Sequence, residues 1–228
     1  MSRTFYSMRY FNFRLLFAGN ILASTGTWMR FLAQDWLVLT ELTDHDASQV
    51  GVVTALQFAP QLFVTPWAGL LADRLDRRRL LQSTQIFNTL LAVALGVLVL
   101  SGRSQLWHLY IFAFLGGLGA ALENPTRQAF VSQVVPKESL VNAVGLNSMA
   151  FNIGRLLGPA SAGLIIDWVG TGWVYIINAF LFLMPTVALT LMRTDDLHPH
   201  IRIPKAKGQM REALTYVKAR PEIVMVLT

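Results

Sequence analysis

The sequence predicts an all-α integral membrane protein, and three observations support this fold class. Of the 228 residues, 54% are hydrophobic and only 14% are charged, with a mean hydropathy of +0.46. That is more apolar surface than a globule of this length could bury, so lipid must cover the remainder. Six apolar segments are long enough to cross a bilayer, and basic residues gather between them. The runs show no alternation of apolar and polar residues, which excludes a barrel.

A helix needs roughly 20 apolar residues to cross a bilayer core of about 30 Å. The first predicted span, 13–40, holds Arg30 and lacks a small-residue cleavage site, so it is a retained helix and not a signal peptide. The next two spans, 49–72 and 80–101, are joined by a short basic loop, which is typical of a membrane hairpin that turns in the cytoplasm. The last three predicted spans are 107–131, 140–166 and 172–192.

These spans form the first predicted domain, a six-helix bundle over residues 1–192. The polar tract 193–221 is predicted to be a cytoplasmic linker, because four apolar residues recur there at helical spacing opposite charged ones. Such a pattern is typical of an amphipathic helix on a membrane surface. Residues 222–228 begin a seventh apolar segment, and the chain is expected to end within it. The four apolar residues are Met210, Ala213, Leu214 and Val217.

Counting Lys and Arg by loop orients the spans. With the N-terminus inside, sixteen of the nineteen basic residues are on the cytoplasmic side; Arg103 is outside, and Arg30 and Arg155 fall within spans. The outside loop 41–49 is acidic. The positive-inside rule therefore predicts a multi-pass protein of the cell (inner or plasma) membrane with a cytoplasmic N-terminus. The sixteen are Arg3, Arg9, Arg14, Arg74, Arg77, Arg78, Arg79, Arg127, Lys137, Arg193, Arg202, Lys205, Lys207, Arg211, Lys218 and Arg220.

Composition disfavours two other function classes. The net charge of +6 could suggest nucleic-acid binding, but the basic residues form no stripe with interleaved aromatics. The chain has no cysteine, and its four histidines lie in loops or interfacial positions without a ligand constellation, so neither an enzyme nor a metal site is expected. No Gly-Lys motif that would cradle a phosphate occurs.

The loop between the second and third spans, GLLADRLDRRR, carries the clearest motif. It resembles the loop between helices 2 and 3 of the major facilitator superfamily, where this cluster makes charged contacts with a second bundle and holds the outward-open state closed on the cytoplasmic side. The alternative is an anchor that binds only anionic lipid headgroups. The residues that carry the resemblance are Gly69, Leu71, Ala72, Asp73, Arg74, Arg77 and Arg78.

The fifth span carries a second motif, NIGRLLGPASAG. It resembles the glycine-proline motif in helix 5 of antiporter-type members of the superfamily, and the alternative is ordinary tight packing of small residues. The stretch 123–148 is further similar to the subfamily that contains the bacterial enterobactin exporter and related transmembrane secretion permeases. The motif residues are Gly154, Gly158, Pro159 and Gly163.

The resemblance implies a twelve-helix fold of two six-helix bundles around a central site. This chain would supply the N-terminal bundle and the start of helix 7. The implied activity is secondary transport by alternating access, which members of the superfamily often couple to proton antiport, and no cofactor is expected. The expected partners are a small-molecule solute, membrane lipids and the C-terminal half. We expect an exporter of a small amphiphilic or anionic molecule, such as a siderophore or a drug.

The sequence departs from the family pattern at two positions. Asp76 stands where the loop motif usually has a glycine before its arginine pair, so a left-handed turn is not expected there. Ala113 stands where helix 4 of proton-coupled drug exporters carries an arginine. Proton coupling through that arginine therefore does not transfer to this chain.

Charged residues inside the spans are the candidate substrate site. A charge in the middle of a bilayer costs a few kcal/mol, so it should face a cavity or a partner. Arg30 and Asp35 in the first span and Arg155 in the fifth are predicted to line a central cavity that suits a solute of negative character. The alternatives are interfacial placement for Asp35, a structural bridge for Arg30, and a contact between Arg155 and Glu123.

Two other functions fit the same pattern. A lysophospholipid translocator of the same superfamily is the nearest alternative in substrate class. A non-transporting membrane adaptor is compatible with six spans, but the polar residues within the spans are costly in lipid unless they line a cavity. Those polar residues are Asn20, Gln34, Gln57, Asn88, Asn147 and Asn152.

Overall fold

The computed structural model describes residues 3–198, except for the side chains of residues 3, 4 and 73. Six long helices make up most of this part, and Leu37–Leu42 continues the first of them as a π-helical turn. Three short 3-10 segments flank the long helices, at Arg3–Arg9, Lys137–Ser139 and Thr194–Asp196. The long helices are α1 (Phe11–Trp36), α2 (Ala47–Arg74), α3 (Arg77–Leu100), α4 (Leu106–Val134), α5 (Leu140–Val169) and α6 (Thr171–Leu191).

Each predicted span coincides with one of these helices to within a few residues, which confirms the all-α class. Four of the helices are long and apolar enough to cross a membrane: α3, α4, α5 with the short segment before it, and α6. The other two, α1 and α2, are similarly long, but their most apolar stretches are less hydrophobic than those of the four. The predicted linker helix and the seventh segment lie mainly in residues 199–228, outside the described part.

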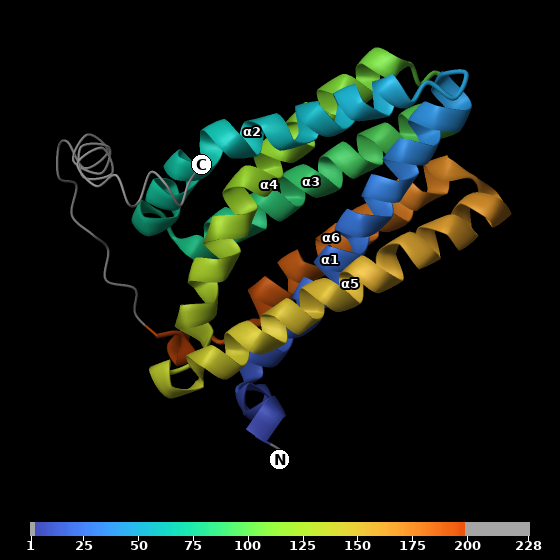
Figure 1. Cartoon of the computed structure of the whole chain (residues 1–228). Coiled ribbons are helices and arrows are strands. Elements are labelled where there is room, and N and C mark those ends of the chain that lie inside the picture. The colour runs from blue at the N-terminus through green and yellow to red at the C-terminus, as the bar shows by residue number, and fades with distance from the viewer. Residues whose placement is uncertain (1–2, 199–228) are drawn as a thin grey trace, which may run out of the picture.

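The helices pack as two groups of three (Figure 1). Helix α1 packs along α5 and α6, while α4 packs along α2 and α3, and a long contact between α3 and α6 joins the two groups. Exchanging the first three helices with the last three converts one set of contacts into the other. Such an arrangement of internal repeats is characteristic of transporter folds, with the binding site near the repeat interface.

Two apolar clusters close the ends of the bundle and leave a polar layer between them. One cluster lies where the N-terminus, the α2–α3 turn and the α4–α5 turn meet, and includes Phe13 and Phe130. The other lies at the opposite end and includes Met29, Leu109 and Val174. Polar side chains of α1, α3 and α4 occupy the layer between the clusters. This layer is therefore where a polar solute would find partners.

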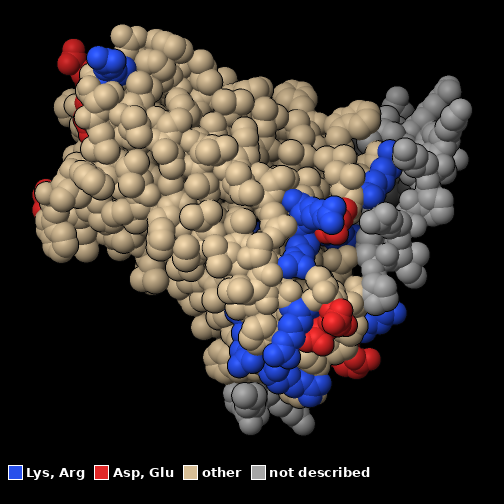
Figure 2. Space-filling model, turned by 180° about the vertical axis from the view of Figure 1, so that it is seen from behind, with Lys and Arg blue, Asp and Glu red and all other residues tan. Residues whose placement is uncertain are grey.

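Charge is distributed unequally along the bundle. Figure 2 shows Lys and Arg gathered toward one end, a broad uncharged middle, and a few charges at the far corner. The uncharged surface carries large apolar side chains, and Leu62, Phe63, Leu156 and Trp168 are each at least 75% exposed. Exposed apolar area on this scale needs lipid or a protein partner. The basic residues of the described N-terminal segment, the α2–α3 turn, the α4–α5 turn and the segment after α6 include Arg9, Arg14, Arg74, Arg77, Arg78, Arg79, Lys137 and Arg193.

Candidate transport site

A cavity of about 300 Å³ lies in the polar layer, bordered by residues of all six helices. Its apolar wall is aromatic and includes Trp28, Phe31 and Phe58, with Phe151 and Phe182 from α5 and α6. Aromatic faces favour planar apolar groups. The polar wall consists of Ser24, Thr27, Arg30, Gln57, Gln61, Asn88, Glu123, Asn124 and Arg127.

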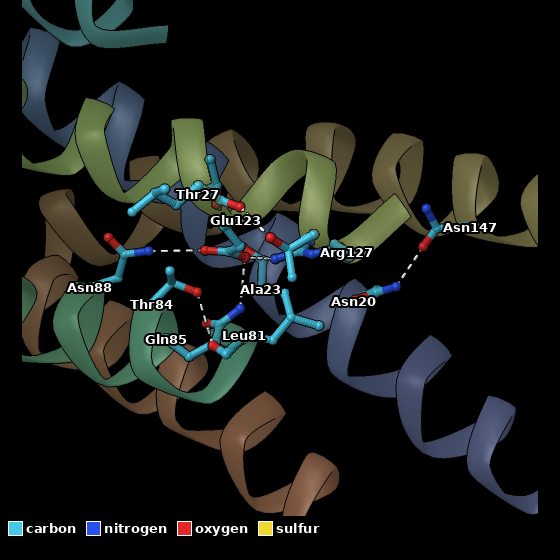
Figure 3. A network of polar contacts seen from close by, with 12 residues as sticks. Asn20, Ala23, Thr27, Leu81, Thr84, Gln85, Asn88, Glu123, Arg127 and Asn147 are labelled. Atoms are coloured by element: carbon cyan, nitrogen blue, oxygen red, sulfur yellow. Dashed lines mark hydrogen bonds and ion pairs between the residues drawn. The ribbon is translucent and has the colours of Figure 1, made fainter. Parts of the chain in front are cut away.

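A closed polar network surrounds Glu123 of α4 (Figure 3). The carboxylate accepts hydrogen bonds from Gln85 Nε2 at 2.7 Å and from Asn88 Nδ2 at 3.0 Å, both on α3. Arg127, one turn further along α4, forms an ion pair with it. Glu123 is only 5% exposed, so these three donors compensate for the loss of water. The positive charge of Arg127 is therefore already neutralised.

Arg30 of α1 presents the opposite situation. Among the described residues, its guanidinium has no acidic partner and no hydrogen-bond acceptor; it lies over the Phe31 ring, 5.3 Å from the centroid. It also borders a second, smaller space of about 10 Å³ together with Gln34, Asn88 and Tyr175. The cavity thus contains one arginine that is neutralised, Arg127, and one whose charge is available to a ligand, Arg30.

The three residues predicted to line the cavity occupy different places. Arg30 lines it, whereas Asp35 and Arg155 are not among its lining residues. Asp35 is half-buried near the end of α1, and Arg155 is exposed on α5 with its guanidinium over the ring of Trp28, 5.4 Å from the centroid. Arg155 therefore contacts Trp28, which lines the cavity, without lining the cavity itself.

The predicted loop motif lies at the turn between α2 and α3. Arg77 is buried and donates to the carbonyl oxygens of Ala72 at 3.2 Å and Ala129 at 2.9 Å, which ties the turn to α4. Arg78 donates from Nε to the Leu189 carbonyl oxygen at 2.7 Å and from Nη2 to the Thr190 carbonyl oxygen at 3.0 Å. These contacts join the α2–α3 turn to two other helices at the basic end.

The remaining motif residues are also at this turn. Arg74 is the last residue of α2, and a Cβ at Gly69 would have no described neighbour within 4 Å. Asp73 is in the last turn of α2, but its side chain is outside the described part. Asp76 has a φ of −66° and accepts a hydrogen bond from the Arg79 amide at 3.1 Å, so it caps the N-terminus of α3. An N-cap replaces the glycine turn here.

Two of the four motif residues of α5 mediate close helix packing. Gly154 and Gly158 are buried against α1, where an added Cβ at Gly158 would lie 2.7 Å from the Thr25 carbonyl oxygen and 2.9 Å from the Met29 amide nitrogen. Pro159 lies within the helix, and a Cβ at Gly163 would have no described neighbour within 4 Å. The first two glycines therefore set the distance between α1 and α5.

Sequence reasoning missed the central role of the Glu123 network. It counted Arg127 with the cytoplasmic residues although the predicted span 107–131 contains this position, and α4 places Arg127 within the helix beside Glu123. The four-residue spacing of the acid and the base was the available signal. Asn20 and Asn147 were recognised as polar span residues, and the structure joins them by a hydrogen bond of 2.5 Å between α1 and α5.

The sequence profile of a family described as transmembrane secretion effectors matches residues 2–228. The chain belongs to this family of the major facilitator superfamily. Among curated relatives, the staphyloferrin A transporter of Staphylococcus aureus (strain NCTC 8325 / PS 47) is 35% identical over 154 residues, which cover 67% of this chain and 38% of the relative. The uncharacterized MFS-type transporter YfiS of Bacillus subtilis (strain 168) is 28% identical over 211 residues, covering 90% and 49%.

Other relatives include the putative multidrug resistance protein MdtD of Cronobacter sakazakii, 30% identical over 139 residues, which are 57% of this chain and 28% of the relative. The chain thus spans half or less of the length of these curated relatives. The predicted superfamily and subfamily are confirmed.

Solved structures show the same fold. A bacterial homolog of the human lysosomal transporter Spinster, in an inward-facing and unoccupied conformation, matches with a TM-score of 0.63 and 19% identity over 92% of this chain and 50% of that one. A POT family transporter in complex with a thioalcohol-conjugated peptide matches with a TM-score of 0.67 and 16% identity over 94% and 45%. The six helices therefore have the arrangement of one half of a major facilitator transporter.

Proposed function

We propose that this chain forms the N-terminal half of a secondary transporter that works by alternating access and exports a small amphiphilic or anionic molecule. Membership of the transmembrane secretion effector family supports the transport activity. Relatives named for staphyloferrin A and for multidrug resistance support a siderophore or a drug as the solute. The proposed location is the cell's inner or plasma membrane, with the N-terminus in the cytoplasm.

The observation that carries the proposed substrate class is the available charge of Arg30. An isolated cation inside a bilayer is costly unless a partner compensates for it. Arg127 has Glu123 as its partner, but among the described residues the guanidinium of Arg30 has only the contact with the face of Phe31. An anionic solute group would supply the missing compensation, while the aromatic wall would accept the apolar part of the same molecule.

A transport assay tests this proposal directly. The protein expressed from its natural gene would be reconstituted in liposomes, and uptake of an anionic and a cationic aromatic dye would be measured. R30Q should reduce transport of the anion about tenfold, as expected for loss of a charge-assisted contact, with little effect on the cation. R103Q is the matched control, because Arg103 is exposed in the α3–α4 loop away from the cavity. Equal loss of both dyes in R30Q would contradict an anionic substrate.

R155Q completes the substrate test. Arg155 was predicted to line the cavity, but it is not a lining residue and contacts the cavity only through Trp28. We expect a smaller and less charge-selective loss than for R30Q. A selective loss of anion transport as large as in R30Q would instead place Arg155 on the solute's path.

The orientation has its own experiment. A single labelling cysteine at Asp44 should react with an impermeant maleimide added outside the cell, and one at Asp76 only after permeabilisation. The basic end of Figure 2 motivates this assignment through the positive-inside rule. The reverse labelling pattern would invert the proposed topology and with it the position of the gate.

The loop motif is proposed to act as the cytoplasmic gate. Arg77 and Arg78 are anchored to α4 and α6 by carbonyl contacts, which hold the turn in place. We propose that Asp73 and Arg74 engage a second bundle from this position. A preference of a few kcal/mol for one state shifts populations strongly. D73N should therefore lower transport while membrane insertion stays normal. Unchanged transport would reduce the loop to a lipid anchor.

A further inference from the structure

Three glycines in one segment of α4 face two different kinds of neighbour. A Cβ at Gly116 would lie 2.6 Å from Arg30 Nη1, and one at Gly119 would lie 2.6 Å from Asn88 Oδ1. A Cβ at Gly117 would instead collide with the backbone carbonyl group of Gln57 on α2. Gly117 therefore permits two helices to approach, whereas Gly116 and Gly119 make room for polar side chains of the cavity.

The neighbour of Gly116 is the far end of a flexible side chain. A methyl group at this position would leave the helix backbones undisturbed, because Arg30 has rotatable bonds that absorb the clash. The guanidinium, however, would have to leave the surface of α4. The missing side chain at Gly116 thus leaves the room in which the guanidinium of Arg30 lies.

A second feature marks the same place. Tyr175 of α6 is fully buried, and its hydroxyl has no hydrogen-bond partner among the described residues. Tyr175 and Arg30 border the same space of about 10 Å³, which is about the room that one oxygen atom the size of water requires. An oxygen atom of a ligand placed there would contact the guanidinium and could satisfy the hydroxyl.

We propose that Gly116 is a positioning residue that determines charge selectivity: it seats the Arg30 guanidinium so that Arg30 and Tyr175 together receive one oxygen of an organic sulfonate or carboxylate. The aromatic wall formed by Phe31 and Phe58 accepts the ring system of the same ligand. This inference rests on the proposed function of the cavity as a solute site. It makes a glycine, which has no polar side chain of its own, responsible for ligand choice through the position of Arg30.

A matched pair of ligands tests the proposal. Binding of 2-naphthalenesulfonate and of 2-naphthalenesulfonamide, which share the ring and differ in charge, would be measured by calorimetry on the protein expressed from its natural gene in lipid nanodiscs. G116A should weaken sulfonate binding about tenfold and change sulfonamide binding less than about twofold, as expected for one lost charge-assisted contact. Y175F should weaken sulfonate binding by a smaller factor of about three to five.

Two controls separate this effect from a general defect. G145A should leave both ligands unaffected, because a Cβ at Gly145 would have no described neighbour within 4 Å. In the G116A background, R30K should restore part of the sulfonate preference, because the compact ammonium avoids the added methyl group. If Gly116 only allowed close helix packing, R30K would not be expected to restore selectivity to G116A.

The outcomes distinguish this inference from the proposed function. If R30Q loses the sulfonate preference while G116A keeps it, the positioning role is wrong and the anion site stands. If R30Q also keeps the preference, the anion site itself is wrong. If G116A fails to accumulate in the membrane while G145A does, Gly116 is a packing residue like Gly117, and the inference is overturned.

Discussion

The contact between α1 and α5 and the contact between α3 and α4 hold helices together in different ways. In the first, Gly154 and Gly158 bring α5 against the backbone of α1. In the second, Gln85 and Asn88 donate to the buried Glu123. Neither relies on the hydrophobic effect, because lipid is as apolar as the side chains it would replace.

This difference predicts different tolerances to mutation. A contact set by missing side chains cannot accept added volume, because backbone atoms cannot move aside. A hydrogen-bonded contact accepts a change of shape but not an unpaired charge. The first contact therefore determines whether the bundle forms, and the second determines the charge that the cavity presents.

The largest effect is expected for added volume at the α1–α5 contact. In G158L, the side chain would meet the Thr25 carbonyl oxygen and the Met29 amide, so we expect a loss of about 3 kcal/mol or more and little folded protein. G163L is the matched control, since in the described part of the chain no atom lies within 4 Å of a Cβ at this position. Thermal unfolding in detergent, followed by size-exclusion chromatography, measures both. Similar behaviour of the two variants would show that α5 does not depend on this close contact.

The next largest effect is expected for an unpaired charge at the α3–α4 contact. E123Q leaves Arg127 without its counter-ion at a site where its side chain is only 16% exposed, which should cost about 3 kcal/mol. The double variant E123Q/R127Q removes both charges and should recover most of that loss. Unfolding midpoints of the two single variants and the double variant measure the coupling. A double variant as unstable as E123Q would show that shape, and not charge, holds this contact.

The comparison also shows which parts of the structure the sequence could predict. Span length and apolar composition predicted all six helices, because both are local properties of the chain. The energetic cost of a charge in lipid predicted that Arg30, Asp35 and Arg155 line the cavity; Arg30 borders it, whereas the other two do not. The count of basic residues by loop placed Arg127 on the cytoplasmic side, because such a count does not use the position of Glu123 one helical turn earlier.

Tertiary partners could not be predicted in this way. The guanidinium of Arg30 lies against Gly116, and the two residues belong to helices that are distant in sequence. The pairing of Asn20 with Asn147 has the same character. A single sequence specifies that such polar groups need partners, but the choice of partner depends on how the two groups of three helices pack.

A smaller effect is expected where the loop motif meets α6. Arg78 donates to the carbonyl oxygens of Leu189 and Thr190, which lack partners within the helix because they belong to its last turn. R78Q should therefore destabilise the bundle by about 1 to 2 kcal/mol. R79Q should have almost no effect, since Arg79 is exposed. Equal unfolding midpoints for the two variants would show that α6 does not need this cap.

The smallest effect is expected at a surface helix cap outside both contacts. Asp46 caps α2 by accepting from the Ser48 amide at 2.9 Å and from the Ser48 hydroxyl at 2.5 Å, and Gln49 adds a third hydrogen bond. These hydrogen bonds, the one from the Ser48 side chain foremost, lower the pKa of Asp46 below its ordinary value. The stabilisation is therefore complete above the unfolded-state pKa of about 4 and is lost as the pH falls through the lower folded-state value.

Hydrogen exchange of the Ser48 amide measures this directly. Relative to the Leu191 amide, which is far from the cap, its protection should decline as the pH falls below about 4. D46N should retain capping but lose the pH dependence, because asparagine accepts the same hydrogen bond without titrating. D44N, two residues earlier and not at the cap, is the control and should keep the wild-type profile. An unchanged pH profile in D46N would show that the first turn of α2 responds to another group, and that Asp46 acts only through its shape.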